Sequence, residues 1–398
     1  FNRILEAQEF DIRAINFSTY GASFVHIDEN GEILTPLYNY TKPMDEALIS
    51  SFYEKYDPDG DFSIKTGSSN SGMLNSGMQL YWLKYTKPEV FKKIKYSLHL
   101  PQYLSYIFTG IPLSEYTSIG CHTALWDYEK KDYHSWVYEE EINKILPPIV
   151  STETSINMNY NGKRIKIGVG IHDSSSALLP YVRSIKKPFI LVSTGTWSIS
   201  LNPFSNELLT EDDINKGSIT YMRINGKPVK SSRIFLGNEY RENVQKLAKY
   251  YNVSDDYHKS VCFDYDIFSL IEENVNSIED FHSFDDSENT AFVNLPFSTF
   301  EIAYHHLMTR LVKLQVKSIE IAKGKIDIKK LFVDGGFSDN QVYIHLLSHY
   351  LRDMKLRTTT SSLGSALGAA ISISDTKLNS KFLKQNYSLK KHVPFILK

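Results

Sequence analysis

The chain has 398 residues, which is long for a single hydrophobic core, so two domains are expected. Its 44 basic and 46 acidic residues leave a net charge of -2, which argues against nucleic acid or an anionic membrane as a partner. No apolar run approaches the roughly 20 residues that cross a bilayer, and two cysteines are too few for a disulfide framework or a zinc site. We therefore expect a soluble, cytoplasmic protein with small or neutral partners.

The first half of the chain alternates strand-like and helical patterns. The sequence opens without Met in a helical pattern, so earlier elements are expected to be missing from it. Strands are predicted over 12–17 and 23–27, with an Asn-Gly turn after the second. Residues 76–109 are predicted to be helical, and a strand over 165–169 leads through a turn into another helix. This alternation is typical of an α/β fold.

The second half repeats the same alternation. A basic, proline-ended stretch at 183–188 indicates a domain boundary, and a strand is predicted directly after it. A long amphipathic helix is predicted over 302–323, followed by a buried strand ending in "DGG" and a helix over 342–351. The polar, Lys-rich tail after Asp375 is expected to be peripheral or poorly ordered.

The segment "LVSTGTWSIS", residues 191–200, has two interpretations. Two β-prone runs joined by a short link with glycine are typical of a hairpin. The same turn offers backbone N–H groups and hydroxyls to a phosphate, and its glycine permits a close approach of the main chain. It is not a Walker A loop, because no Gly-x-x-x-x-Gly-Lys-Ser/Thr occurs in the chain.

The segment "GVGIHDSSSA", residues 168–177, places Asp173 between a strand and a helix. An aspartate in this position is commonly a helix N-cap. In α/β folds, however, ligands bind at the carboxyl ends of strands, where such a carboxylate could accept a proton from a substrate hydroxyl. The twelve histidines show no metal-ligand spacing such as HExxH, which argues against a zinc enzyme.

Two glycine-rich segments near the C-terminus complete the set of candidate motifs. In "FVDGGFSDNQ", residues 332–341, a buried strand ends in a Gly-Gly turn on which a flat ligand could pack, although a plain strand-to-helix turn would look similar. The segment "GSALGAA", residues 364–370, predicts a thin helix that allows either close helix packing or an adjacent nucleotide.

In their shared order these motifs resemble those of the FGGY carbohydrate kinases, and within them most closely the rhamnulokinases and fuculokinase-like relatives. The segments "HDSSSA", "STGTWSIS", "DGGFSDNQ" and "GSALGAA" each resemble a family motif. So do "NFSTYGASFVHIDENG" at 16–31 and "EYTSIGCHTALWD" at 115–127. The resemblance covers roughly residues 11–372 in scattered blocks.

The resemblance implies two ribonuclease H-like domains of the actin, Hsp70 and sugar-kinase type, with ATP and sugar meeting in a cleft between them. Residues 1–183 would form the sugar-binding domain, its first strands missing, and 184–398 the nucleotide-binding domain. Asp173 would be the catalytic base. The residues implied to bind the sugar are Gly21, His172, Asp173 and Ser174; those facing the phosphates are Ser193, Thr194, Gly195 and Thr196; and those holding adenosine are Gly335, Gly336 and Asn340.

The implied reaction transfers the γ-phosphate of ATP, with Mg²⁺, to a hydroxyl of a ketose such as rhamnulose or fuculose. Xylulokinase-like or glycerol kinase-like specificity and a non-catalytic, ATP-switched sugar sensor stay open as alternatives. The family's first phosphate loop has no counterpart in the sequence, so no metal-ligating residue is assigned, and residues 232–243 show no clean match. The oligomeric state also stays open, a homodimer included.

Overall fold

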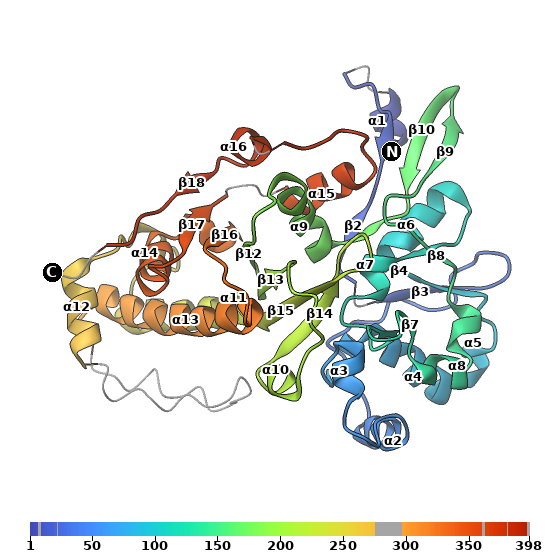
Figure 1. The fold of residues 1–398 in the computed structure, drawn as a ribbon, viewed down its shortest axis with the longest axis horizontal. Helices are drawn as coiled ribbons and strands as arrows, with labels where there is room; N and C mark the ends of the chain where they lie inside the picture. The colour runs from blue at the N-terminus through green and yellow to red at the C-terminus, as the bar shows by residue number, and fades with distance from the viewer. Residues whose placement is uncertain (7–8, 22, 275–296, 360–362, 380, 396–398) are drawn as a thin grey trace. The chain divides into compact units, whose positions relative to one another are not determined.

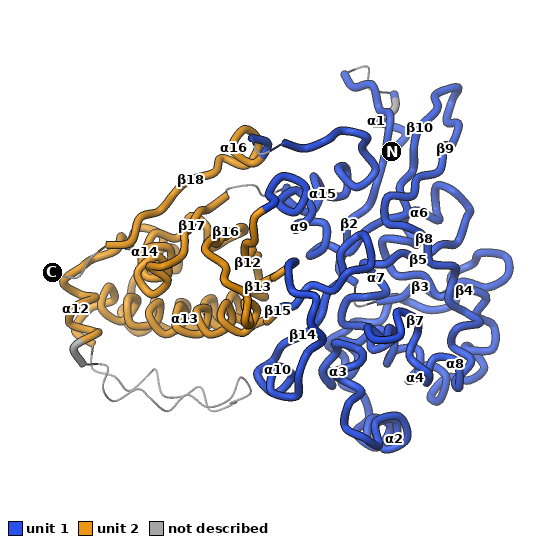
Figure 2. The backbone as a smooth tube through the Cα atoms, in the orientation of Figure 1, with its two compact units in different colours: residues 1–186, 203–231, 363–382 blue, residues 187–202, 232–362, 383–398 orange. Residues whose placement is uncertain are grey.

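The computed structural model describes residues 1–398 except 7–8, 22, 275–296, 360–362, 380 and 396–398 (Figure 1). The chain divides into two compact units, each built from three separate stretches (Figure 2). Unit 1 comprises 1–186, 203–231 and 363–382, and unit 2 comprises 187–202, 232–362 and 383–398. The functional division at residues 183 and 184 stays a prediction, and each unit is described by itself.

The strands of unit 1 are short and form several small sheets. In the one that matters for the site, β11 (Ile171–His172) pairs in parallel with β2 (Ser18–Thr19), so that His172 lies opposite Thr19. The other groups are β1 (Ala14–Ile15) with β10 (Lys163–Gly168) and β9 (Ser155–Tyr160), β3 (Phe24–Ile27) with β4 (Tyr96–His99), β5 (Ser114–Glu115) with β8 (Ile149–Val150), and β6 (Trp126–Asp127) with β7 (Asp132–Tyr133).

Proline and glycine mark some of the helix ends in unit 1. Pro88 stands at the first position of its helix, and Gly110 ends another in the left-handed conformation at φ 66°. The predicted helical stretch 76–109 is interrupted by strand β4, which the sequence analysis missed. The helices are α1 (Asn2–Glu6), α2 (Glu46–Tyr56), α3 (Phe62–Thr66), α4 (Ser76–Thr86), α5 (Pro88–Phe91), α6 (Leu100–Thr109), α7 (Tyr116–Ile119), α8 (Ser135–Glu139), α9 (Asp173–Ser184), α10 (Glu211–Asn215) and α15 (Gly364–Ser372).

An aromatic cluster forms the main core of unit 1. Phe52, Phe62 and Trp136 are fully buried and meet edge to face, as in the Phe52–Phe62 pair with centroids 5.4 Å apart. Such pairs combine a large buried apolar area with a favourable ring geometry. The cluster anchors α2, α3, α4 and α8 to one another.

Unit 2 contains the larger sheet, in which neighbouring strands follow the order β13-β12-β16-β17-β18. These strands are β12 (Ile190–Thr194), β13 (Ser198–Asn202), β16 (Lys330–Gly335), β17 (Lys355–Thr358) and β18 (Lys390–Lys391). The central strands β12, β16 and β17 run parallel. In β12 and β16 a run of buried apolar residues is typical of a strand that is covered on both faces. The chain passes from unit 1 to unit 2 within β15 (Pro228–Ile234), which follows β14 (Ser218–Met222).

The longer helices among the described residues of unit 2 are α11 (Leu236–Tyr251), α12 (Tyr265–Asn274), α13 (Phe300–Lys323) and α14 (Gln341–Tyr350). The predicted helix over 302–323 is confirmed as α13, which begins two residues earlier because Thr299 caps it. Helix α13 packs against β12 and β13 and also contacts α11 and α14 (Figure 1). Its Leu307 and Leu311 are fully buried in the core of the unit.

The polar tail was expected to be peripheral, and most of its described residues are exposed, so the expectation holds except at two buried side chains. The side chains of Leu383 and Tyr387 are only 2% and 1% exposed. Leu383 belongs to the short helix α16 (Phe382–Asn386), and Tyr387 follows it directly. Residues 390–391 form β18, which pairs with β17. In the described part of the chain, no helix combines the length and the apolar character that a membrane span requires.

Candidate functional site

Asp173 lies where β11 passes into α9, and it is the first residue of that helix. The N-cap position belongs to His172, so the capping interpretation of Asp173 does not describe the structure. The side chain of Asp173 is 45% exposed. Its Oδ1 accepts a hydrogen bond from the backbone N–H of Ser174 at 2.5 Å and another from the hydroxyl of Ser174 at 3.1 Å. A carboxylate at a helix N-terminus is also stabilised by the helix dipole. Asp173 thus combines a fixed position with access to a ligand.

His172 is held rigidly beside this carboxylate. Its backbone N–H donates to Thr117 Oγ1 at 3.0 Å, and its ring stacks on Tyr221 with centroids 5.4 Å apart. Its Nε2 lies 3.3 Å from Asp173 Oδ1. Burial lowers the pKa of His172, against the opposing effect of Asp173 and Glu115. A neutral imidazole at this position can orient the carboxylate without carrying a permanent charge.

Gly21 lies directly against His172. A Cβ at Gly21 would stand 2.5 Å from His172 Cδ2 and 2.8 Å from Cys121 Sγ, which is closer than real contacts allow. The absence of a side chain at Gly21 therefore lets the chain pass beside the imidazole. The structure brings together Gly21, His172, Asp173 and Ser174, the four residues predicted to bind the sugar.

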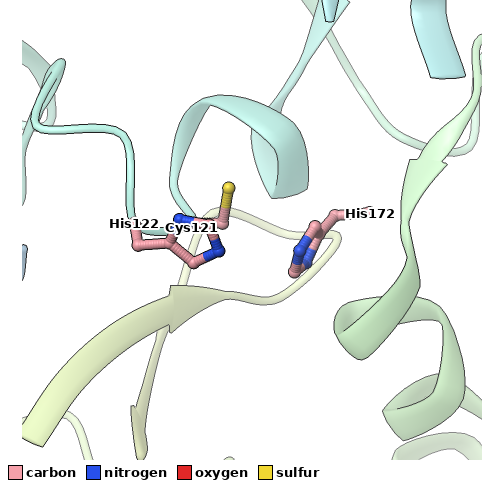
Figure 3. A group of neighbouring side chains, drawn as sticks. All are labelled: Cys121, His122 and His172. Atoms are coloured by element: carbon pink, nitrogen blue, oxygen red, sulfur yellow. The ribbon is translucent and has the colours of Figure 1, made fainter. Parts of the chain in front are cut away.

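Cys121 and His122 lie in the same place, although the sequence analysis gave them no role. Cys121 Sγ and one nitrogen each from His122 and His172 lie within 4.8 Å of one another, and all three residues are buried (Figure 3). The Cys121 thiol donates to the carbonyl of Ser118 at 3.3 Å. An adjacent Cys-His pair was the available signal, but the second histidine comes 50 residues later in the chain.

In unit 2, the turn after β12 is a hairpin, so that interpretation is confirmed for the backbone. Thr194 pairs with Ser198 across the hairpin, and the N–H of Gly195 donates to the carbonyl of Trp197 at 2.9 Å. Gly195 and Thr196 are exposed, whereas Ser193 is half-buried. The tip of the hairpin is therefore the part that a ligand could reach.

Thr194 has a structural task in this turn. Its hydroxyl donates to the carbonyl of Asp334 at 2.6 Å and accepts from the N–H of Phe337 at 3.1 Å. The threonine is buried, and both hydrogen bonds tie the hairpin to the turn that follows β16. Thr194 thus positions two predicted nucleotide-binding turns relative to each other, and its own hydroxyl is already occupied.

The two glycines of the Gly-Gly turn differ. Gly335 has φ 88°, and a Cβ there would stand 2.0 Å from the carbonyl oxygen of Thr194. Gly336 has no atom within 4 Å of such a Cβ position, and both glycines are exposed. Gly335 is therefore required by backbone conformation and close packing, whereas Gly336 offers bare backbone with open space beside it.

Asn340 caps α14. Its Oδ1 accepts from the N–H of Tyr343 at 3.0 Å, and its Nδ2 donates to the hydroxyl of Tyr304 at 2.9 Å. Both ends of the amide thus have partners within the protein. The helix-capping role explains why an asparagine stands here, and a contact with adenosine stays a prediction.

The segment 232–243, which had no clean family match, reaches the hairpin through Gly237. The N–H of Gly237 donates to the carbonyl of Thr196 at 3.1 Å, and a Cβ at Gly237 would stand 2.0 Å from the carbonyl oxygen of Gly195. The start of α11 therefore lies against the hairpin tip. A single glycine after a strand was too weak a signal for the sequence analysis to assign.

The glycine-rich helix α15 packs closely on α9 within unit 1. A Cβ at Gly368 would stand 1.9 Å from the carbonyl oxygen of Ser176, so this position excludes any larger residue. The hydroxyl of Ser176 also donates to the carbonyl of Ser365 at 2.6 Å. Of the two interpretations of "GSALGAA", close helix packing describes Gly368.

A cavity of about 600 Å³ lies in unit 1 away from these residues. It is lined by residues of α9 from Ser175 onward, by residues 223–225 and by residues 374–378. An ion pair between Arg183 and Glu153, with 2.5 Å between nitrogen and oxygen, stands at its wall. The cavity contains none of the residues predicted to bind sugar or nucleotide.

Comparison with known proteins agrees with this arrangement. Residues 2–178 match the model of the N-terminal domain of the FGGY family of carbohydrate kinases. The chain is 22% identical over 384 residues to the rhamnulokinase of Oceanobacillus iheyensis, with 89% of this chain and 76% of the relative covered. It is 23% identical over 208 residues to the L-fuculokinase of Escherichia coli, with 49% of this chain and 42% of the relative covered.

Solved structures share the fold. A carbohydrate kinase from Novosphingobium aromaticivorans superposes with a TM-score of 0.77 at 21% identity, over 100% of this chain and 86% of that one. A xylulose kinase from Lactobacillus acidophilus gives 0.76 at 13% identity, over 99% and 82%. Fold and sequence together define the protein as a sugar kinase, an α/β phosphotransferase. Its residues 2–178 match the N-terminal domain of the FGGY family of carbohydrate kinases, and the similarities support an ATP-dependent carbohydrate kinase.

Proposed function

We propose that the enzyme transfers the γ-phosphate of ATP to a hydroxyl of a rhamnulose-like or fuculose-like ketose, with Asp173 as general base. The observation that carries this proposal is the half-exposed carboxylate of Asp173, fixed at the start of α9 beside the buried imidazole of His172. Gly21 and Ser174 lie next to these two groups and complete the proposed sugar site. The curated relatives named rhamnulokinase and L-fuculokinase support this class of sugar.

The chemistry asks for positioning more than for covalent work. In phosphoryl transfer the protein places the acceptor hydroxyl in line with the γ-phosphate and stabilises the developing charge. A carboxylate is too weak a base to ionise an alcohol beforehand, so Asp173 orients the hydroxyl and takes its proton as the oxygen–phosphorus bond forms. His172, 3.3 Å from Asp173 Oδ1, restricts the carboxylate to one orientation.

The nucleotide is assigned to unit 2 in this proposal. Ser193, Thr194, Gly195 and Thr196 belong to the proposed phosphate turn, in which the exposed Gly195 and Thr196 make the contacts and Thr194 holds the turn in place. Gly335, Gly336 and Asn340 are proposed to hold adenosine. The exposed, unobstructed backbone at Gly336 supports this assignment, because a flat base can pack on it.

Magnesium is the expected companion of ATP in phosphoryl transfer. Mg²⁺ prefers oxygen ligands in octahedral geometry. The group of side chains in the described residues that could share an ion, Cys121 with His122 and His172, offers sulfur and nitrogen instead. That group does not fit Mg²⁺, so the proposed mechanism assigns no step and no protein ligand to the metal.

Two alternatives share the same fold. Xylulose or glycerol could be the acceptor, or the protein could bind ATP and sugar as a sensor without turnover. We favour catalysis because Asp173 is both exposed and positioned, which a sensor does not require. We also propose a cytoplasmic enzyme, because its two cysteines, Cys121 and Cys262, are not joined in a disulfide.

The decisive experiment is the Asp173→Asn variant assayed for ADP release against a panel of ketoses and polyols. We expect loss of turnover with ATP binding retained, because asparagine keeps the shape but cannot accept the proton. Asp212→Asn serves as the matched control, since Asp212 is a 71% exposed aspartate of the same unit that pairs with Lys216. A variant with more than about a tenth of the wild-type rate would refute the base, whose usual contribution is 10²–10⁴-fold. Sugar binding without any turnover by the wild type would favour the sensor.

A further inference from the structure

We propose that Cys121, His122 and His172 form a binding site for Zn²⁺, and that an ion held there inhibits the kinase by competing with the sugar. The metal site depends only on the geometry of unit 1. The inhibitory effect also depends on the proposed function, because it assumes that the sugar binds beside His172.

The positions of the three donor atoms fit a shared ion. One ligand atom from each residue lies within 4.8 Å of the other two (Figure 3). With Zn–S near 2.3 Å and Zn–N near 2.0–2.1 Å, tetrahedral ligand atoms lie about 3.3–3.6 Å apart. Side-chain shifts of about 1 Å are therefore enough to bring the three atoms onto one ion.

A second observation concerns His172. Its side chain is 2% exposed, yet its Nδ1 has no hydrogen-bond partner among the described residues. Burying a polar atom without a partner is costly, so such an atom calls for an explanation. An ion bound at Nδ1 itself would provide the missing partner.

The tautomer of His122 is also suited to an ion. Its Nδ1 lies 3.0 Å from the carbonyl oxygen of Leu74, which can only accept a hydrogen bond, so the proton is on Nδ1. Nε2 is then the nitrogen of the ring that can ligate a metal ion. A carbonyl that fixes the far nitrogen in this way is the usual outer support of a metal-binding histidine.

The donor set selects the metal. A thiolate and two imidazoles suit Zn²⁺ and related transition metals, whereas Mg²⁺ and Ca²⁺ require oxygen. Three protein ligands leave the fourth tetrahedral position open to water or another small ligand. In its ligand number the site therefore resembles zinc sites with an open coordination position more than closed structural ones.

An ion in this position would obstruct the proposed sugar site. Gly21 already lies within contact distance of both His172 and Cys121, which leaves little room around them. Asp173 Oδ1 is 3.3 Å from His172 Nε2, so a dication on the imidazole would attract the carboxylate that the sugar hydroxyl needs. Metal and sugar should therefore exclude each other.

Cobalt(II) is the probe for the metal site, because it replaces zinc and reports its ligands by absorption. We expect a sulfur-to-cobalt charge-transfer band and intense visible bands typical of a tetrahedral ion. Cys121→Ser should abolish the charge-transfer band, and His122→Gln should weaken zinc binding at least about tenfold, the lower end of what losing an outer partner costs. Cys262→Ser is the matched control, since this cysteine is exposed and belongs to unit 2.

Circular dichroism decides whether Cys121→Ser folds, and His122→Gln provides the test if it does not. A cobalt spectrum without a sulfur band, or one that Cys262→Ser abolishes and Cys121→Ser leaves unchanged, would overturn the metal site. Zinc affinity unchanged in His122→Gln would do the same.

Inhibition is measured with sugar and ATP varied separately at fixed free Mg²⁺. We expect Zn²⁺ to raise the apparent KM for the sugar without changing kcat, and a chelator to reverse this effect. The Cys121→Ser variant should require at least about tenfold more zinc than the wild type for the same inhibition. Equal zinc sensitivity of wild type and Cys121→Ser would overturn the inhibitory role. If no sugar is phosphorylated at all, the proposed function fails, while the cobalt spectrum still decides the metal site.

Discussion

Glu140 offers a quantitative test of the structure, because this carboxylate joins three helices of unit 1. Glu140 is the C-cap residue of α8. From α4, its carboxylate accepts hydrogen bonds from Lys84 at 2.6 Å and Tyr85 at 2.9 Å. From α2, it accepts hydrogen bonds from Lys55 at 3.1 Å and from Tyr56. Its side chain is 3% exposed. The variant Glu140→Gln removes the charge and keeps the shape.

The expected magnitude follows from the pKa of Glu140. Burial alone would raise it, but the hydrogen bonds from Lys84, Tyr56, Lys55 and Tyr85 outweigh burial and lower it from the ordinary 4.5 to about 2. At 1.36 kcal/mol per pKa unit this corresponds to about 3 kcal/mol of folding free energy. Because the folded-state pKa is lowered, this stabilisation is fully present above about pH 4.5 and is lost as the pH falls towards 2.

The assay is urea unfolding followed by tryptophan fluorescence in a Trp197→Phe background, which confines the signal to the three tryptophans of unit 1. At neutral pH, Glu140→Gln should lower the free energy of unfolding by about 3 kcal/mol, and the two curves should converge towards pH 2. Glu141→Gln is the control: this neighbour is 65% exposed and pairs with the equally exposed Lys144, so little change is expected. A difference below about 1 kcal/mol, the size of a surface ion pair, or one independent of pH, would refute the reasoning.

Further predictions concern the glycines of the proposed site. Gly335→Ala should lower the melting temperature, because a Cβ would stand 2.0 Å from Thr194 O at φ 88° and cost at least about 1–3 kcal/mol. Gly336→Ala, with nothing within 4 Å, should melt like the wild type, and equal melting of the two variants would contradict the described turn. Gly21→Ala should press on His172 and raise the KM for the sugar more than the KM for ATP. Steady-state kinetics decide this, and equal changes in both constants would count against a sugar-binding role for Gly21.

Much of the fold could be predicted because apolar periodicity and glycine–proline punctuation are local signals. The predicted start of helix α13 lies within two residues of the observed start, since the buried stripe of this helix repeats over 24 residues. Strand β4 was missed because four residues between two helices carry too little pattern. The burial of Tyr387 was missed because a single aromatic in a polar stretch finds its partners only in the tertiary structure.

The site was predictable where one segment carries it and unpredictable where distant segments meet. The strand-turn-helix pattern at 168–177 placed Asp173 correctly at the end of a strand. The sequence could not show that the hydroxyl of Thr194 is taken by a carbonyl 140 residues away. Nor could it show that Cys121 and His122 meet His172, because the cysteine count and the histidine spacing had both argued against a zinc site.

The threefold division of each unit has a consequence for dissecting the enzyme. Unit 1 draws 203–231 and 363–382 from beyond its first stretch, and α15 supplies the surface against which α9 packs at Ser176. A fragment ending near residue 186 would expose that face of α9 and lose the Tyr221 ring that stacks on His172. Unit 1 is therefore not a portable fragment: a truncated gene must keep all three of its stretches to retain the surroundings of His172 and the proposed base.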